Sequence, residues 1–165
     1  MVKFATINVK GLIKDSHQVS LTKAIVDGNL DVVGVQELTT DLYKPPDEYQ
    51  MIVNLGEPDV VRRPRGTMIL YRTGMSLGTV KKSPDGLIIR AEFMDMTVVN
   101  IYGPVKESGK EGTGPEEATR LRRIHKRFYT MEVVKYLNAW DENLIVMGDF
   151  NENHPPERQA EILYH

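Results

Sequence analysis

The chain has 165 residues, a length typical of one domain, and 41% of them are hydrophobic, which is enough to form a packed core. Its 21 basic and 23 acidic residues leave a formal net charge of −2, which argues against a protein that binds nucleic acid through bulk positive charge alone. Because it contains no cysteine, disulfides, thiolate zinc sites and cysteine nucleophiles are excluded.

The first part of the chain is predicted to form a strand, a helix and a second strand. Residues 2–9 are β-branched and aromatic in character, which favours a strand. Residues 15–28 are predicted to be helical, because Asp15 and Ser16 suit a helix start and Gly28 suits a helix end. The apolar run 31–35 is typical of a strand buried on both faces. This order favours an α/β layer architecture.

The middle of the chain is predicted to form four strands separated by turns. These strands cover residues 51–54, 67–71, 87–93 and 97–102. Their close spacing indicates antiparallel pairing rather than connections through helices. A proline-rich loop, 43–48, precedes them, and a polar loop, 106–114, follows them.

The last third of the chain is predicted to contain a helix and one more strand. The helix begins at Pro115, a favoured first-turn residue. Its apolar positions recur at three- and four-residue spacing, which is typical of a helix. These positions are Leu121, Ile124, Phe128, Met131, Val134 and Leu137. Residues 144–147 are predicted to form the last strand, and a short helix is predicted after Pro156.

The predicted helix also carries five basic residues within eight positions. They are Arg120, Arg122, Arg123, Lys126 and Arg127. Such a cluster suits a surface that follows nucleic-acid phosphates. It is also typical of the solvated face of an amphipathic helix, and this second interpretation is favoured because such faces are routinely charged. Arg62, Arg63 and Arg65, in a proline-containing loop, are the preferred candidates for DNA contact.

Polar side chains follow three of the apolar strands, at the point where each strand ends. The first strand runs into Asn8, the second into Gln36 and Glu37, and the last into Asp149-Phe150-Asn151. Such side chains commonly lie in the crevice beyond the end of a sheet, where ligands bind. Their oxygen atoms suit Mg²⁺, which needs only one or two carboxylates. Each alone is typical of a turn or surface residue, whereas their joint occurrence indicates a site.

Four segments together resemble the motifs of the endonuclease/exonuclease/phosphatase superfamily. Residues 4–12 (FATINVKGL) resemble its "WNVNGL" opening, and residues 35–38 (VQEL) resemble its "LQET" segment. Residues 99–104 (VNIYGP) resemble "NxYxP", and residues 148–151 are similar to its "GDFN" signature. They occur in the family's order and span essentially the whole chain. The resemblance implies an α/β (α+β) fold, a four-layer αββα sandwich.

The same resemblance implies a role for each polar residue. Glu37 would be the principal ligand of Mg²⁺ or Mn²⁺, with Asn8 beside it in the metal site. Tyr102 would contact the scissile phosphate, and Asp149 would position or deprotonate the attacking water. Asn151 would donate a hydrogen bond to a phosphate oxygen. A metal and fixed donors of this kind suit phosphodiester hydrolysis, because they stabilise the charge that builds up on the phosphate.

The middle of the chain resembles a narrower group. Residues 66–71 (GTMILY) and 83–93 resemble the apurinic-type endonuclease domain of LINE-type non-LTR retrotransposons. This resemblance implies an enzyme that nicks target DNA, within a parent protein that carries a reverse transcriptase. We infer no membrane and no obligate protein partner, since there is no apolar run near the roughly 18 residues of a membrane span. With no signal peptide evident, we expect an intracellular location, nuclear only insofar as the substrate is DNA.

The family pattern continues beyond its "GDFN" signature through further strands to an Asp and a Ser-Asp-His segment. This chain has fourteen residues after Asn151, and neither His154 nor His165 lies in such a motif. We therefore expect residues 1–165 to be the N-terminal portion of one domain that lacks its C-terminal strands. Two alternatives follow: a non-catalytic truncated fragment, or a phosphatase, deadenylase or sphingomyelinase of the same fold.

Overall fold

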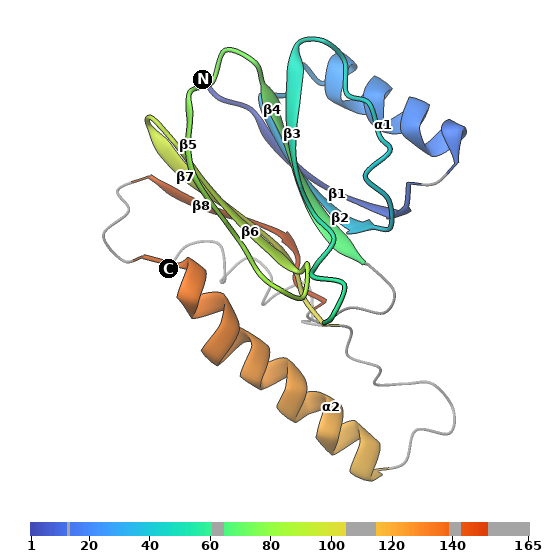
Figure 1. Cartoon of the computed structure of the whole chain (residues 1–165), viewed down its shortest axis with the longest axis vertical. Helices are drawn as coiled ribbons and strands as arrows, with labels where there is room; N and C mark the ends of the chain where they lie inside the picture. The colour runs from blue at the N-terminus through green and yellow to red at the C-terminus, as the bar shows by residue number, and fades with distance from the viewer. Residues whose placement is uncertain (13, 61–64, 105–114, 139–142, 152–165) are drawn as a thin grey trace, which may run out of the picture.

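Two four-stranded sheets pack face to face, with helical segments on their outer faces (Figure 1). The computed structural model describes residues 1–12, 14–60, 65–104, 115–138 and 143–151. Four predicted features lie outside these residues: the loop at 106–114, the short helix after Pro156, and the DNA-binding candidates Arg62 and Arg63.

The first sheet has the strand order β1-β2-β4-β3. Its strands are β1 (Phe4–Gly11), β2 (Val32–Leu38), β3 (Tyr49–Asn54) and β4 (Gly66–Arg72). β1 and β2 run parallel and are joined by helix α1 (Asp15–Asp27), which confirms the predicted strand–helix–strand unit. β4 pairs antiparallel with both β2 and β3. Leu21 and Ile25 of α1 are buried against the outer face of this sheet.

The second sheet has the strand order β5-β6-β7-β8. Its strands are β5 (Leu77–Lys82), β6 (Ile88–Phe93), β7 (Met96–Tyr102) and β8 (Leu144–Asp149). β5, β6 and β7 are antiparallel, and β8 runs parallel to β7. The sequence does not predict β5, because this strand lies at a sheet edge and all its side chains except the half-buried Val80 are exposed. Polar, lysine-bearing edges are common in natural sheets, since they discourage pairing with other chains.

The main core lies between the two sheets. Val32 and Ile69 of the first sheet are fully buried against Ile89 and Val98 of the second. A separate cluster on the outer face of the first sheet packs under α1, because successive strand residues point to opposite faces. This layering confirms the predicted αββα sandwich.

The helix predicted from Pro115 is present, but most of its described apolar positions are exposed. α2 (Pro115–Arg127) continues into a π-helical turn, η1 (Phe128–Glu132), and a 3₁₀ turn, η2 (Val133–Tyr136). Phe128 and Val133 are buried against the outer face of the second sheet, whereas Met131 and Leu137 are exposed. A π turn and a 3₁₀ turn have different numbers of residues per turn, so a regular 3.6-residue pattern loses its register there. Among the described residues, no helix is long and apolar enough to cross a membrane.

Candidate active site

Glu37 lies in an irregular part of β2. The pairing of β2 shifts between Gln36 and Leu38 against both of its neighbours, β1 and β4. Glu37 itself has a φ of +58°, in the left-handed region that residues other than glycine rarely adopt. Bulges change the direction of a side chain, and strained backbone of this kind clusters at functional sites. The strained conformation of Glu37 is therefore maintained by the pairing of β2 with its neighbouring strands.

Asn8, at the end of β1, joins two carboxylates. Its Nδ2 donates to Oε1 of Glu37 at 2.9 Å and to Oδ2 of Asp149 at 2.8 Å. Its Oδ1 accepts a hydrogen bond from the backbone N–H of Lys10 at 3.1 Å. Both ends of the amide are thereby used, which fixes its orientation. The three half-buried side chains come from β1, β2 and β8, and the structure brings them together as the motif order predicts.

Asp149 and Asn151 lie at the end of β8. The second oxygen of Asp149, Oδ1, accepts the backbone N–H of Asn151 at 3.0 Å. The side-chain amide of Asn151 donates to the carbonyl oxygen of Gly103 at 2.6 Å, and Asn151 has a φ of +49°. The turn after β8 thus folds back against the end of β7. These two hydrogen bonds, one from the backbone N–H and one from the side-chain amide, hold Asn151 beside Asp149.

Gly148, one residue before Asp149, permits the close pairing of β7 and β8. Its φ is +142°, and a Cβ at this position would collide with the backbone of Ile101, including the carbonyl oxygen. Glycine adopts such a φ without steric cost, and it leaves room for the neighbouring strand. The glycine of the GDFN segment is therefore required for the geometry that carries Asp149.

Tyr102 pairs with Asp149 across β7 and β8. Its side chain is buried, and among the described residues its hydroxyl has no hydrogen-bond partner of good geometry. Burial, followed by the nearby negative charge of Glu37, raises the pKa of Tyr102 above its usual range, and the guanidinium of Arg65 partly offsets this. The hydroxyl therefore stays protonated at neutral pH and remains a donor. Arg65, a predicted DNA contact, lies next to this hydroxyl.

A buried polar network behind the site links the two sheets. Nε2 of Gln36 donates to Oδ1 of Asn100 at 2.7 Å, and Nδ2 of Asn100 donates to two backbone carbonyls of the first sheet, at 3.1 and 3.0 Å. The hydroxyl of Thr6 donates to Oε1 of Gln36 at 3.1 Å. Gln36 and Asn100 belong to the recognised motifs, but the sequence does not reveal this role for them. A satisfied network of this kind fixes the relative position of the sheets.

The donor set suits a hard cation. Glu37 and Asp149 are carboxylates brought close together by one amide, and Mg²⁺ binds through one or two carboxylates while keeping several waters. In the described part of the chain no group of three or more histidine and acidic side chains is placed to hold a metal. The residues fit magnesium or manganese rather than zinc.

Comparison of the structure with solved structures identifies the fold. An AP endonuclease from Archaeoglobus fulgidus superimposes with a TM-score of 0.65 at 19% identity, over 97% of this chain and 63% of that one. The 3′ phosphatase NExo from Neisseria, bound to a product DNA hairpin, gives a TM-score of 0.60 at 18% identity, over 94% of this chain and 60% of that one. A 3′-5′ exonuclease from Neisseria meningitidis gives a TM-score of 0.54 at 20% identity, over 91% of this chain and 58% of that one.

These similarities show an α+β fold of the endonuclease/exonuclease/phosphatase type. This chain spans less than two thirds of the length of each of these proteins. No model of a known protein family matches the sequence, and no curated protein matches it.

Proposed function

We propose that this chain belongs to a metal-dependent phosphodiester hydrolase that cleaves DNA endonucleolytically. One observation carries the proposal: the amide of Asn8 holds the carboxylates of Glu37 and Asp149 together, beside the buried hydroxyl of Tyr102. The structural neighbours support it, since they are named as an endonuclease, a phosphatase and an exonuclease, and one is bound to DNA.

The metal would be Mg²⁺ or Mn²⁺, held chiefly by Glu37 with Asn8 in the same site. When bound, the ion would supply positive charge against the phosphate as negative charge builds up on it. Because the Asn8 amide nitrogen faces both carboxylates and its oxygen is used by Lys10, we propose that Asn8 serves this site mainly by positioning Glu37 and Asp149. A group that holds a ligand in place commonly affects metal affinity strongly.

The remaining residues would bind and orient the reactants. A Tyr102 hydroxyl that stays protonated can donate to a phosphate oxygen. The amide of Asn151 has a second N–H beyond the one that it donates to Gly103, and this N–H can reach a phosphate oxygen. Each oxygen of Asp149 accepts one hydrogen bond and keeps further acceptor capacity, with which it can orient an attacking water.

The narrower assignment is a retrotransposon-type endonuclease that nicks target DNA for a reverse transcriptase in the same parent protein. It rests on the resemblance of residues 66–71 and 83–93 to LINE-type endonuclease domains. Residues 66–71 lie in β4, and residues 83–93 end in β6. A nuclear location would follow from a DNA substrate.

Two alternatives remain. The phosphatase and exonuclease among the structural neighbours favour removal of a 3′-terminal group over an internal nick. The second alternative is a chain that does not turn over substrate by itself, and the assays below distinguish it from both enzymes.

The test is an assay of the purified chain on supercoiled plasmid with Mg²⁺ or Mn²⁺. We expect nicking by the wild type, loss of nicking in Glu37→Ala, and retention in Glu57→Ala, which removes an exposed carboxylate elsewhere. A parallel assay on an oligonucleotide with a 3′ phosphate distinguishes a phosphatase. No product in either assay contradicts catalysis by this chain, and equal activity in wild type and Glu37→Ala contradicts the assigned site.

A further inference from the structure

The end of α2 is attached to the strand that carries the candidate site. The hydroxyl of Tyr129, in η1 directly after α2, donates to the carbonyl oxygen of Phe150, which lies between Asp149 and Asn151. The Tyr129 ring also packs against His125 and Phe128, with ring centroids 4.9 and 5.1 Å apart. These contacts hold the last turn of α2 close to the site.

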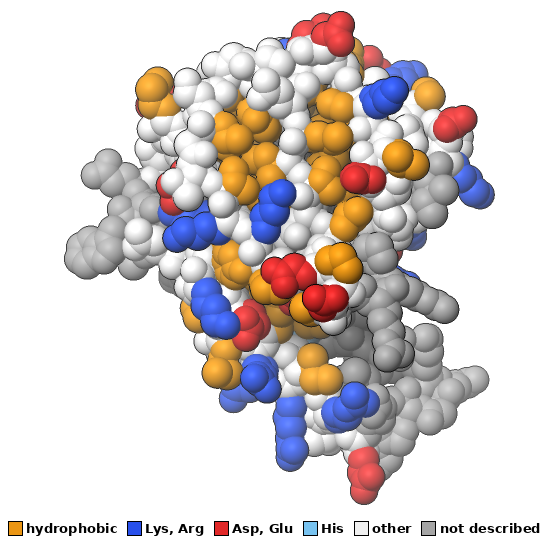
Figure 2. Space-filling view, viewed as in Figure 1, with side chains coloured by type: hydrophobic (Ala, Val, Ile, Leu, Met, Phe, Trp, Pro, Cys, Tyr) orange, Lys and Arg blue, Asp and Glu red, His pale blue; other side chains and the backbone are white. Residues whose placement is uncertain are grey.

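From this attachment α2 extends away from both sheets (Figure 1). Of the α2 side chains that the structure describes, His125 is buried, whereas Arg123, Lys126 and Arg127 are exposed, and so is 44% of Ile124. The helix therefore does not pack along its length as a regular amphipathic helix would. Figure 2 shows Lys and Arg side chains gathered over the part of the molecule where Figure 1 places α2.

The helix dipole accounts for only part of this concentration of charge. Arg123 stands three positions before Lys126 and four before Arg127, so the like charges are neighbours on the helix and repel. Within the described part of the chain, no acidic side chain forms an ion pair with any of these three. Basic residues in the last turn complement the helix dipole, but Arg123 lies before that turn. A polyanion is the ligand that would relieve this repulsion.

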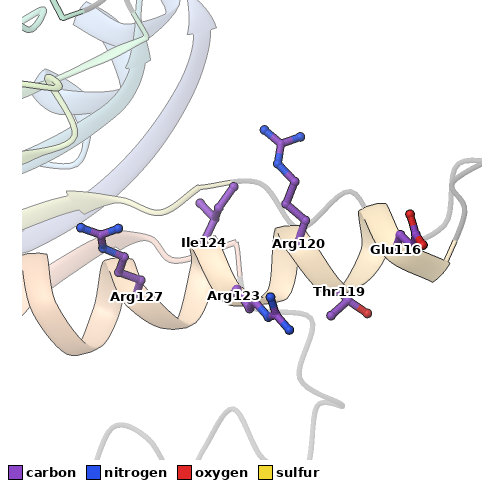
Figure 3. Close-up of a pocket in the computed structure, with 6 residues that line it drawn as sticks. All are labelled: Glu116, Thr119, Arg120, Arg123, Ile124 and Arg127. Carbon is purple, nitrogen blue, oxygen red and sulfur yellow. The ribbon is translucent and has the colours of Figure 1, made fainter.

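The spacing of the cations suits a phosphate backbone. Figure 3 shows Arg120 and Arg127 projecting from the same side of α2, with Ile124 between them and Arg123 directed elsewhere. These residues, with Glu116 and Thr119, line an open hollow along the helix. Seven residues of helix rise about 10 Å, which corresponds to roughly three phosphates of one DNA strand along the duplex axis.

We propose that Arg123, Lys126 and Arg127, together with Arg120, bind the phosphate backbone of duplex DNA flanking the candidate active site. This inference rests on the proposed function and deepens it. A duplex with one phosphate in the site would meet α2 next to it, because Tyr129 ties the helix to Phe150. Contacts of this kind position DNA without reading its sequence. They would lower KM and leave kcat unchanged.

The test measures binding separately from cleavage. Anisotropy of a fluorescein-labelled duplex of about 30 base pairs is recorded in EDTA between about 50 and 200 mM salt. The test variant is Arg123→Gln/Lys126→Gln/Arg127→Gln. The matched control, Lys23→Gln/Lys81→Gln/Lys82→Gln, removes the same charge from exposed residues of α1 and β5. Each lost phosphate contact lowers the slope of log K against log salt by about 0.9.

We expect the test variant to lose about two to three units of that slope, while the control keeps the wild-type slope. Arg123→Lys/Arg127→Lys keeps the charge and should keep the slope, which assigns the loss to charge rather than to the shape of the arginine side chains. An unchanged slope in the test variant, an equal loss in the control, or no binding by the wild type overturns the inference. Glu37→Ala should bind like the wild type, so loss of nicking in that variant tests the proposed function independently of this surface.

Discussion

Asn8 and Asp149 stand 141 residues apart in the chain and are joined by a hydrogen bond of 2.8 Å. The same amide nitrogen donates to Glu37, so one neutral group separates two carboxylates. Hydrogen bonds to charged groups contribute about 1.5–3 kcal/mol each, more than bonds between neutral groups. Asn8 is therefore expected to matter for stability as well as for the site.

Replacing Asn8 by Asp should destabilise the protein strongly at neutral pH. The change removes both hydrogen bonds and places a third carboxylate against the first two. We expect a loss of about 2–4 kcal/mol in the free energy of unfolding at pH 7. The loss should shrink in acid, because protonation removes the repulsion between the carboxylates. Urea unfolding in EDTA at pH 7 and in acid measures this.

Thr73→Asp is the control for this variant, because it adds the same charge at an exposed turn. It should change the free energy of unfolding by no more than about 0.5 kcal/mol. An Asn8→Asp variant as stable as Thr73→Asp at pH 7 would contradict the bridging role of the amide.

The backbone at Glu37 predicts a conflict between stability and function. With a φ of +58°, any residue with a Cβ is strained there, and glycine is not. Glu37→Gly should therefore be about 1 kcal/mol more stable to unfolding than Glu37→Ala, although both variants lack the carboxylate. Thermal and urea unfolding of the two variants measure the difference. If the alanine variant proves equal or more stable, Glu37 is not strained in solution.

Gly148 should tolerate no side chain. Gly148→Ala forces a Cβ into the backbone of Ile101 and adds strain at a φ of +142°. We expect a loss of about 2–3 kcal/mol, together with loss of any metal-dependent activity because Asp149 moves. Gly74→Ala is the matched control, since no atom lies within 4 Å of a Cβ there. Equal unfolding midpoints for the two variants would show that β7 and β8 pair less tightly than described.

Tyr102 should make stability depend on pH in alkaline solution. Its pKa is raised in the folded chain, so the unfolded chain loses the proton first as the pH rises through about 10. The contribution of Tyr102 to stability is thus complete below pH 10 and declines above it. Tyr43, Tyr71 and Tyr136 also have raised pKa values. Tyr102→Phe should therefore reduce the alkaline decline without abolishing it.

The difference in tyrosinate absorbance between the wild type and Tyr102→Phe follows the ionisation of Tyr102 directly. Arg65→Gln should raise the pKa of Tyr102 further, because the guanidinium favours the ionised form. Arg72→Gln is the control, since Arg72 pairs with Asp31 rather than with the site. A Tyr102 ionisation that does not respond to Arg65 would place the two groups further apart than described.

The sequence alone predicted most of the strands of the sandwich, and it predicted that polar residues at three strand ends lie close together. β-branched and apolar runs predict most of the strands, because local side-chain pattern reports which faces are buried. The parallel pairing of β1 with β2 then brings Asn8 and Glu37 to one edge, since the carboxyl ends of parallel strands coincide. Asp149 joins them from β8, as the order of the four motifs implies.

Other features of the structure were decided by contacts between distant parts of the chain, which local sequence patterns do not report. β5 has no hydrophobic pattern and forms by pairing with β6. The turns after α2 follow from the packing of Phe128 and Val133 on the second sheet, which overrides a regular helix. The burial of Tyr102 and the left-handed backbone of Glu37 likewise arise only when the strands pair. The direction in which the Asn8 amide points was not predictable from the sequence, because two carboxylates from other strands determine it.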